Sequence, residues 1–391
     1  MSEPQTTQSL SSERATERAS ERATERERRA TLGLWAVPGL GPVLVGQLRK
    51  AYGSLANALD AGVGAWAFNK EFRVPVPLRG RLGAVDSFEE LADDVLDDAA
   101  RSGMGICFPG DPAYPQNLVA LPDSPPLLFF WGEPQPPRRR VAMVGCRHPD
   151  GGFALTAERF AQQVAEGGVG IVSGAAEGID TSCHWGAAHV GMETWAFVGS
   201  ALDELDSHQR ALVPALIDQG GMAFSEFPPG VRANKQTFPR RNRLISGASD
   251  AVLVLRAGAQ SGAMHTAAAA VSQGRPLLAM PGEVSNEAAV GCNELIAQGF
   301  ATACLSPEDV WRAVGLDPEK VRPRPKQEAV LPEALSADAR MAYGALGRRP
   351  RVYEELEDEL PLGTAELTSA LVELELAGLV LERPGKRYEK I

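Results

Sequence analysis

The sequence predicts an α/β protein with a Rossmann-like parallel-sheet core, an N-terminal helical domain and a C-terminal winged-helix domain. Three observations support this prediction. Short apolar runs in the middle of the chain are separated by stretches long enough for helices. A glycine-containing turn between two apolar segments precedes them. A proline-rich, charged stretch follows them and leads into a pattern of helices and a hairpin.

Length and composition fit a globular protein of two or three domains. The chain has 391 residues, of which 44% are hydrophobic and 23% charged. No apolar run approaches the roughly 18 residues that span a bilayer, and residues 1–29 have no apolar signal region. We therefore expect a cytoplasmic protein with no membrane partner. The net charge of −11 argues against indiscriminate coating of nucleic acid, but allows a local basic site.

The cysteines predict neither disulfides nor a metal site. Their number, five, is odd, and no Cys-x-x-Cys pair occurs. Cys183-His184 and His189 are the only suggestion of metal ligands, and no second cluster completes a tetrahedral set. We expect five reduced thiols, no metal and no cofactor.

Residues 1–31 form a low-complexity tail with a four-residue Glu/Arg repeat. Such a repeat drifts about 40° per repeat around a helix, so its charges face all directions. With nothing apolar to bury, the segment is predicted to be a solvated helix or a disordered tail. A nucleic-acid-binding arm is the alternative, although its acids and bases nearly balance.

Residues 32–104 are predicted to form a helical domain. Its turn at Pro38-Gly39-Leu40-Gly41 is of the helix-hairpin-helix type, in which backbone amides can hold a DNA phosphate. The following helix, 42–52, offers only Arg49 and Lys50 as cations, and the stretch 86–98 is acidic. A packing role for this domain is at least as well supported.

Residues 105–315 form the predicted core. Its apolar runs span 141–145, 170–174, 194–199, 222–226, 251–255 and 276–280. Continuous rather than alternating hydrophobicity is typical of parallel strands buried on both faces. Nearly every run ends in Gly, Ser or Glu, so polar loops should gather at the carboxyl ends of the strands, where open parallel sheets bind ligands.

Residues 316–336 are predicted to be a linker, and residues 337–391 a winged-helix domain. A winged helix suggests duplex binding through a recognition helix. The candidate helix at 364–377 has three glutamates and no Lys or Arg. We therefore expect it to have a packing or protein-interaction role.

The first candidate site segment is a glycine-rich loop after a buried run. It contains Ser173, Gly174 and Gly178 and ends at Asp180. Glycine permits close backbone approach, and free amides at a helix start favour an anion. It is neither a Walker loop nor Gly-x-Gly-x-x-Gly. A purely structural turn remains open.

The second candidate segment is the stretch 227–249, which contains no acid. Its cations are Arg232, Lys235, Arg240, Arg241 and Arg243, and Phe238 lies among them. Cations that hold phosphates, next to an aromatic ring on which bases stack, are what single-strand binding requires. The alternative is a solvated helix start with Phe238 in the core. On the binding interpretation, changing Arg240, Arg241 and Arg243 together to Glu should abolish binding and leave the fold intact.

Other loops should converge on the same edge of the sheet. Arg147 follows the first run, and Ser261, Gly262 and Thr266 open the helix after the fifth. Hydrolytic chemistry finds little support, since neither Gly-x-Ser-x-Gly nor His-Glu-x-x-His occurs. Asp180 and Glu226 could meet as a carboxylate pair, but either could equally cap a helix or pair with an arginine. We therefore expect no catalytic residues.

Taken in order, these motifs resemble those of the DNA-processing protein A (DprA/Smf) family over about residues 105–310. The matching segments are Val-Gly-Cys-Arg147, Ser173 to Asp180 with His184-Trp-Gly-Ala187, Ser-Glu226, Phe238-Pro-Arg-Arg-Asn-Arg243, Ser-Gly262 with Thr266-Ala, Met280-Pro-Gly282 and Gly-Cys-Asn-Glu-Leu-Ile296. The resemblance is specific, because the motifs share the family's order and spacing. The family often has a SAM-like helical domain before the core and a winged helix after it.

The resemblance implies a recombination mediator without enzymatic activity. Such proteins bind and protect incoming single-stranded DNA during natural transformation, load the RecA recombinase and act as homodimers. The family's DNA pocket falls on Arg147, Lys235, Phe238, and the run Arg240, Arg241, Asn242 and Arg243, with backbone from the Ser173–Asp180 loop.

The chain departs from the family pattern at several positions. Ser200-Ala201, Asp206-Ser207, Arg256 and Met264-His265 stand where members usually have Gly-containing, Tyr-Pro, Glu and aliphatic residues. These changes alter the crevice and leave the DNA loops intact. Two other classes of function remain open. One is a nucleotide N-glycosidase like the LOG family, although 259–270 lacks that family's glutamate; the other is an interaction scaffold that does not bind DNA.

Overall fold

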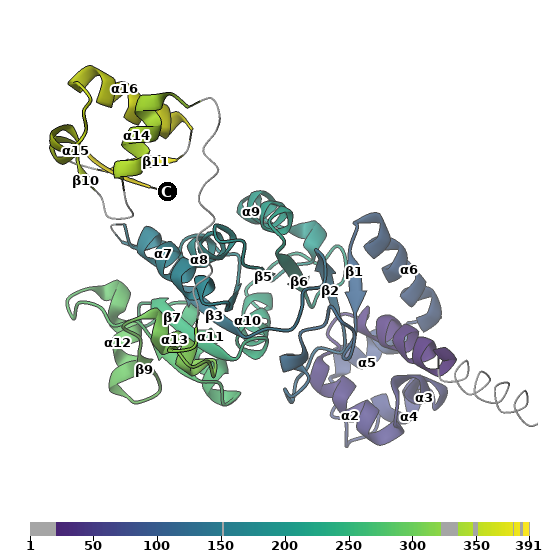
Figure 1. Cartoon of the computed structure of the whole chain (residues 1–391). Coiled ribbons are helices and arrows are strands. Elements are labelled where there is room, and N and C mark those ends of the chain that lie inside the picture. The colour runs from purple at the N-terminus through teal and green to yellow at the C-terminus, as the bar shows by residue number, and fades with distance from the viewer. Residues whose placement is uncertain are drawn as a thin grey trace, which may run out of the picture. The chain divides into compact units, whose positions relative to one another are not determined.

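The computed structural model describes residues 21–150, 152–321, 335–346, 351–377, 379–383 and 386–390. It consists of two compact units, Met1–Arg324 and Pro325–Ile391. The first contains a nine-stranded sheet and the N-terminal helices, and the second a small winged helix (Figure 1). Residues 1–20 and most of the expected linker, 322–334, lie outside the described residues.

All six apolar runs form parallel strands, as predicted. They are β3 (Arg140–Gly145), β4 (Gly170–Ser173), β5 (Thr194–Phe197), β6 (Met222–Ser225), β7 (Ala251–Arg256) and β8 (Leu277–Ala279). The sheet order is β1-β2-β6-β5-β4-β3-β7-β8-β9. The parallel part of the sheet starts at β3 in the middle, and later strands are added on both sides. The carboxyl ends of β3 to β8 therefore lie at one edge.

Three further strands were not predicted. β1 (Gly105–Cys107) and β2 (Leu128–Trp131) form an antiparallel extension on β6, and β9 (Thr302–Ala303) pairs with β8 at the far edge. β1 and β9 have only three and two residues, too few for a periodic pattern, and the apolar run 127–131 that contains β2 was not recognised as a strand. The sheet is therefore mixed, although mostly parallel.

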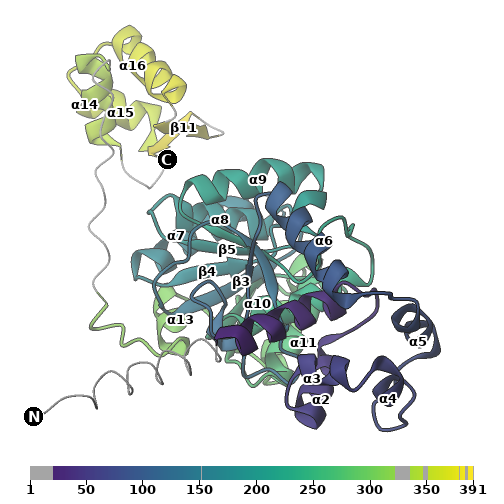
Figure 2. The same cartoon turned by 90° about the vertical axis from the view of Figure 1, so that its right-hand side faces the viewer.

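Helices cover both faces of the sheet, as Figure 2 shows. One face packs on α7 (Phe153–Glu166), α8 (Ile179–Ala188), α9 (Ser207–Asp218) and α13 (Pro307–Ala313). The other packs on α10 (Thr237–Gly247), α11 (Ala263–Ser272) and α12 (Val290–Ala297). Short 3₁₀ turns occur at Gln116–Leu118, Leu202–Glu204 and Glu287–Ala289. Burial on both faces explains why the strands are continuously apolar.

The N-terminal region is helical, as predicted. It comprises a helix over 21–35, then α2 (Pro42–Tyr52), α3 (Leu55–Asp60), α4 (Val63–Ala67), α5 (Val76–Gly83) and α6 (Phe88–Arg101). Trp35 lies at the end of the first helix, and its indole Nε1 donates a 2.8 Å hydrogen bond to the carbonyl oxygen of Glu226. The helical region therefore contacts the sheet at the carboxyl end of β6.

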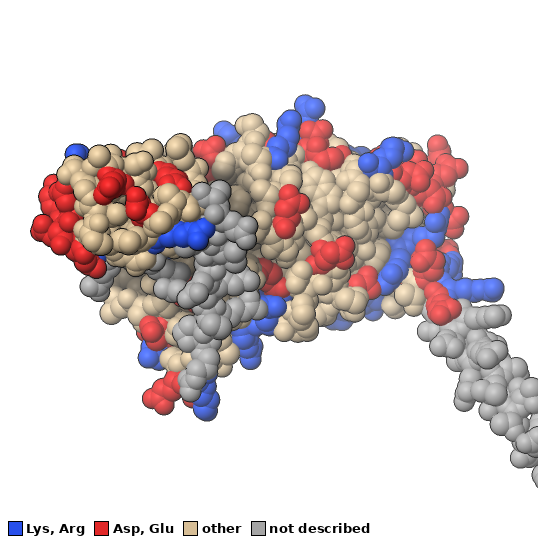
Figure 3. All heavy atoms as spheres, turned by 45° about the horizontal axis from the view of Figure 1, so that its top comes forward, with Lys and Arg blue, Asp and Glu red and all other residues tan. Residues whose placement is uncertain are grey.

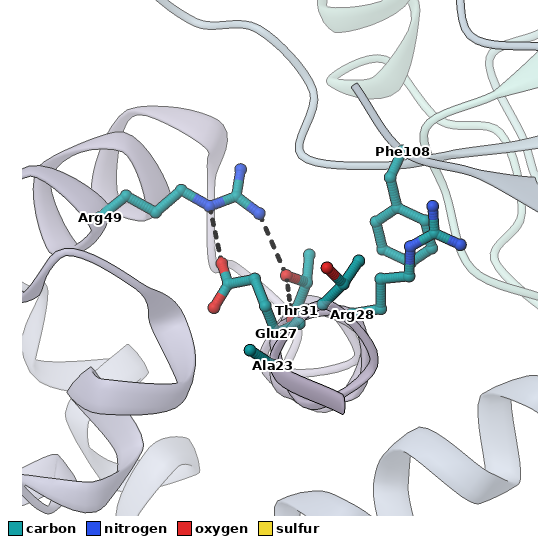
Figure 4. Close-up of a pocket in the computed structure, with 7 residues that line it drawn as sticks. Ala23, Glu27, Arg28, Thr31, Arg49 and Phe108 are labelled. Carbon is teal, nitrogen blue, oxygen red and sulfur yellow. Dashed lines mark hydrogen bonds and ion pairs between the residues drawn. The ribbon is translucent and has the colours of Figure 1, made fainter. Parts of the chain in front are cut away.

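The end of the Glu/Arg tail differs from the expectation of a solvated segment. Glu27 accepts hydrogen bonds from Arg49 (3.0 Å) and from the backbone amides of Leu55 and Ala56 (2.7 and 3.0 Å). Arg28 pairs with Asp111. Figure 4 shows these side chains of the 21–35 helix around a shallow pocket. The Glu/Arg repeat places charges on all faces of the helix. Those that face the rest of the first unit, such as Glu27 and Arg28, form hydrogen bonds and ion pairs.

The second unit has the predicted winged-helix pattern. It contains α14 (Ala337–Ala345), β10 (Arg351–Val352), α15 (Tyr353–Glu359), α16 (Thr364–Leu376), β11 (Val380–Arg383) and β12 (Arg387–Lys390). Figure 3 shows acidic side chains gathered at the left-hand end of this unit. α16 exposes Val372 and Leu376 and presents no cation.

Within the described residues, no helix is long and apolar enough to cross a membrane. The same part of the chain contains no group of three or more His, Cys, Asp or Glu side chains able to hold a metal ion. All five cysteines are free.

Candidate nucleic-acid interface

Arg147 and Phe238 come together above the carboxyl ends of the central strands. The guanidinium carbon of Arg147 lies 5.5 Å from the centroid of the Phe238 ring. Arg147 is exposed and Phe238 is half-buried. A Cβ atom at Gly199 would lie 3.0 Å from Phe238 Cδ1, so the ring rests on the backbone after β5. The backbone at Gly199 therefore supports the Phe238 ring, and the Arg147 guanidinium lies over the ring.

Lys235 precedes α10 and is exposed. The turn that carries it is fixed by Asn234, whose Oδ1 accepts from the amides of Gln236 (2.8 Å) and Thr237 (3.2 Å). This turn holds Lys235 two residues before the helix that bears Phe238. We call the exposed Arg147 and Lys235, together with the half-buried Phe238, the ring site.

Gly178 positions the ring site from the glycine-rich loop. Its φ is +82°, and a Cβ atom there would lie 2.3 Å from the carbonyl oxygen of Arg147. The next residue, Ile179, donates its amide to the carbonyl oxygen of Cys146 (3.2 Å). Only glycine permits this approach, so the loop sets the backbone that presents Arg147.

Ser173 and Gly174 are buried and have structural partners. Ser173 Oγ donates to the carbonyl oxygen of Met143 (2.6 Å), which ties β4 to β3. The amide of Gly174 donates to Asp180 Oδ2 (3.1 Å), and its carbonyl oxygen accepts from Arg241. Neither residue is accessible to a ligand in this conformation, and both support the loop instead.

Arg241 and Asp180 form the buried base of the site. Arg241 is 4% exposed and donates to the carbonyl oxygens of Gly174 and Phe197. Asp180 accepts from the amides of Gly174 and, at 3.4 Å, Gly145. Burial lowers the pKa of Arg241 to about 10, and burial raises the pKa of Asp180 against the opposing effect of Arg241. The two charges join the ends of β3, β4 and β5 to α10.

Arg243 is also engaged by acids, although the segment around it contains none. It pairs with the fully buried carboxylate of Glu226, and its Nε lies 3.3 Å from Asp123 Oδ2. Burial raises the pKa of Glu226, and the positive charge of Arg243 opposes that shift. Glu226 directly follows β6 and Asp123 lies in the loop before β2; both are remote from Arg243 in sequence.

Arg240 remains partly available. Its side chain is 40% exposed, 3.8 Å from Glu226 Oε2, and its guanidinium carbon lies 5.0 Å from the Phe227 ring centroid. Arg232 pairs with Glu204 at 3.0 Å. The segment 227–249 is therefore not a uniformly free basic surface.

The three candidate residues at the start of α11 differ in how exposed they are. Asn242 Nδ2 donates to the carbonyl oxygen of Gly262 (3.3 Å), so Ser261 and Gly262 lie beside α10. Ser261 is half-buried, Gly262 is exposed, and Thr266 is 2% exposed inside the helix packing. Sequence reasoning missed Gly199 and Asn234, which position Phe238 and Lys235. Of these two, only Asn234 could have been identified from the sequence, because an asparagine shortly before a helix often forms such a turn.

Two residues that depart from the family pattern, Arg256 and Asp206, have interaction partners in the structure. Arg256 packs on Phe153, with 3.8 Å from its guanidinium carbon to the ring centroid, and its Nε lies 3.5 Å from Asp150 Oδ1. Asp206 caps α9 by accepting from the amide of Gln209 (2.8 Å). Neither of these contacts involves Arg147, Lys235 or Phe238.

The fold and site together define a Rossmann-like protein with a cation–aromatic surface at the carboxyl edge of its sheet. A family model described as DNA recombination-mediator protein A matches residues 105–315, and one for the DprA winged helix domain matches 325–386. The chain belongs to the DNA recombination-mediator protein A family.

Individual relatives agree. A protein named Protein Smf from Synechocystis is 28% identical over 389 residues, covering 90% of this chain and 96% of its own. A putative DNA processing protein DprA of Mycobacterium tuberculosis is 32% identical over 326 residues, covering 79% and 82%. The X-ray structure of DNA processing protein A from Streptococcus pneumoniae matches with a TM-score of 0.60 at 26% identity, covering 73% of this chain and 97% of that one.

Proposed function

We propose that this protein is a cytoplasmic, non-enzymatic recombination mediator that binds single-stranded DNA during natural transformation. It protects the incoming strand and loads the RecA recombinase. The observation that carries the proposal is the ring site, in which Phe238 rests on Gly199 with Arg147 over it and Lys235 close in sequence. Family membership supports the role in DNA processing.

Each part of the ring site has a distinct task in this function. A base stacks on the exposed part of the Phe238 ring, which is independent of sequence because every base has a π-face. Arg147 and Lys235 neutralise the flanking phosphates. The buried charges beneath, Asp180 and Arg241, keep the ring and the cations in place and do not contact the strand.

Removing the Phe238 ring and the Lys235 cation should weaken single-strand binding more than duplex binding. Phe238→Ala with Lys235→Ala is expected to weaken single-strand affinity by ~10-fold or more, because stacking alone contributes about 1–3 kcal/mol per base. Gel shifts with single- and double-stranded DNA measure the effect. The control is Arg312→Ala, which removes an exposed, ion-paired cation on α13. Unchanged single-strand affinity in the double variant would refute the site.

The glycosidase alternative lacks a catalytic acid in this geometry. α11 has no acidic residue, and Asp180 and Glu226 are buried and engaged with Arg241 and Arg243. We expect no release of free base from nucleoside monophosphates. A scaffold that does not bind DNA predicts instead no affinity for single strands even at low salt.

We also propose that the protein is a homodimer that pairs near the β9 edge of the sheet. β9 is an edge strand, with an unpaired side. Phe300 and Leu305 flank it and are 53% and 77% exposed, and Val284 is 92% exposed in the loop after β8. Large apolar side chains exposed around an edge strand are typical of an interface.

Leu305→Glu is expected to convert the dimer to a monomer, because it places a charge in the contact. Sedimentation equilibrium measures the mass. Val43→Glu adds the same charge on α2, where Val43 is 56% exposed, and should leave the dimer intact. If both variants remain dimeric, the interface lies elsewhere.

A further inference from the structure

A basic surface on the helical region is not used by the ring site. Between the end of α4 and the end of α5, residues 68–81 carry one acid, Glu71, and four cations: Lys70, Arg73, Arg79 and Arg81. Within the described part of the chain, none of these four forms an ion pair with a carboxylate. By contrast, Arg26, Arg28, Arg29 and Arg49 of the same region are all paired with acids.

An exposed aromatic ring lies under one of these cations. Phe68 is 66% exposed, and the guanidinium carbon of Arg79 lies 5.6 Å from its ring centroid. Arg79 is held there because its Nε donates to the carbonyl oxygen of Val74 (2.9 Å). The arrangement repeats the chemistry of the ring site, a phenyl ring with a cation over it and further cations close in sequence.

Arg73 has a backbone conformation that its side chain does not favour. Its φ is +47°, in the left-handed region where glycine and asparagine are preferred. Strained non-glycine residues are found disproportionately at functional sites. The φ of Arg73 is therefore unfavourable for an arginine, and the side chain itself is exposed.

Two hydrogen bonds connect this surface to the carboxyl edge of the sheet. Arg81 donates to the carbonyl oxygen of Pro38 (2.6 Å), and three residues earlier Trp35 donates to the carbonyl oxygen of Glu226. Gly39 makes room for Arg81, since a Cβ atom there would lie 2.8 Å from its guanidinium, and φ is +91°. Glu226 also holds Arg243 of the helix that carries Phe238.

We propose that this surface, defined by Phe68, Lys70, Arg73, Arg79 and Arg81, is a second binding site for single-stranded nucleic acid that extends the path of the strand beyond the ring site. The inference rests on the proposed function and adds a site to it. An exposed ring among unpaired cations suits unpaired bases and phosphates, whereas a duplex offers no free base face. An anionic membrane surface would use the same cations, so the test includes it.

The length of the strand distinguishes the two sites. Compact single-strand sites cover about 4–16 nucleotides, so oligothymidylates of roughly 8 and 24 nucleotides sample one site or both. The surface variant combines Phe68→Ala, Lys70→Gln and Arg73→Asn, because asparagine tolerates the left-handed conformation of Arg73. Fluorescence anisotropy with the full chain gives each affinity over a salt series.

We expect the surface variant to bind the long strand ~5-fold or more weakly and the short strand unchanged, from the loss of one stacked base. The salt slope for the long strand should become shallower by about 1.4, since each single-strand phosphate contact contributes about 0.7. The ring-site variant, Phe238→Ala with Lys235→Ala, should weaken both strands. Arg101→Gln with Arg312→Gln removes two exposed, ion-paired cations and should change neither.

Each other outcome has a definite meaning. If the wild type binds neither strand, the proposed function fails. If it binds both and the surface variant is unchanged on the long strand, the further inference is overturned while the proposed function stands. Equal weakening on a duplex, or loss of binding to phosphatidylserine vesicles with DNA binding intact, would also overturn it. An unchanged urea midpoint for the surface variant confirms that it folds.

Discussion

Replacing Asp180 by asparagine should destabilise the first unit by about 1–3 kcal/mol, the usual cost of leaving buried polar groups without their hydrogen-bond and charge partners. The substitution keeps the volume and one acceptor oxygen and removes the negative charge that faces Arg241. Arg241 is 4% exposed and cannot turn out to solvent without losing its hydrogen bonds to Gly174 and Phe197.

Urea unfolding followed by tryptophan fluorescence measures this change in the first unit alone, because all six tryptophans lie before residue 325. A double variant, Asp180→Asn with Arg241→Met, should be less destabilised than the sum of the two single variants, since it leaves no unmatched charge. Strict additivity would contradict the coupling. Arg312→Ala, at an exposed ion pair, serves as the control and should have little effect.

Acid should destabilise the first unit through His184. This histidine is buried, and burial, with a smaller contribution from Arg241, lowers its pKa to about 3. Its Nδ1 lies 2.6 Å from Thr194 Oγ1, and that hydroxyl donates to the carbonyl oxygen of Ile171. The hydroxyl must therefore accept from Nδ1–H, which leaves Nε2 unprotonated, and Nε2 has no hydrogen-bond partner.

The direction in which stability changes with pH follows from proton uptake by the unfolded chain. Between pH 6.5 and about 3 the unfolded histidine binds a proton and the folded one does not, so stability is full above pH 6.5 and falls with falling pH. We expect a loss of roughly 2–3 kcal/mol from this group between pH 7 and pH 4.5.

His184→Gln should remove this part of the pH dependence, because glutamine does not titrate and can still bond to Thr194. Urea unfolding at pH 7, 5.5 and 4.5 measures the difference between wild type and variant. His148→Gln, at an exposed position, is the matched control. An identical pH dependence in wild type and His184→Gln would refute the assignment.

The same burial corrects one prediction made from the sequence. Changing Arg240, Arg241 and Arg243 together to Glu was expected to leave the fold intact. Arg241 is buried against backbone carbonyls, and Arg243 pairs with the buried Glu226. The triple variant would place carboxylates beside Asp180 and Glu226, so loss of binding would report unfolding. Arg240, 40% exposed, is the member suited to single substitution.

The sequence by itself determined the architecture. Continuous apolar runs identified β3 to β8, because strands buried on both faces need apolar side chains at every position. The glycine-rich loop and the Phe238 segment were placed at the carboxyl edge by the same argument. Local chemistry also identified α2 and the winged helix.

Only the tertiary structure decided which candidate residues are accessible. The sequence stretch 227–249 contains no acid, yet Asp123 and Glu226 reach Arg243 from loops elsewhere in the chain, because ion pairing acts through space. Ser173, Gly174 and Arg241 became supports, and Arg147, Lys235 and Phe238 remained at the surface. Arg79 and Arg81 of α5 precede the acidic stretch 86–98, yet within the described residues neither pairs with a carboxylate, and Asp93 and Asp98 pair with other arginines. Burial and pairing depend on neighbours that the order of residues does not reveal.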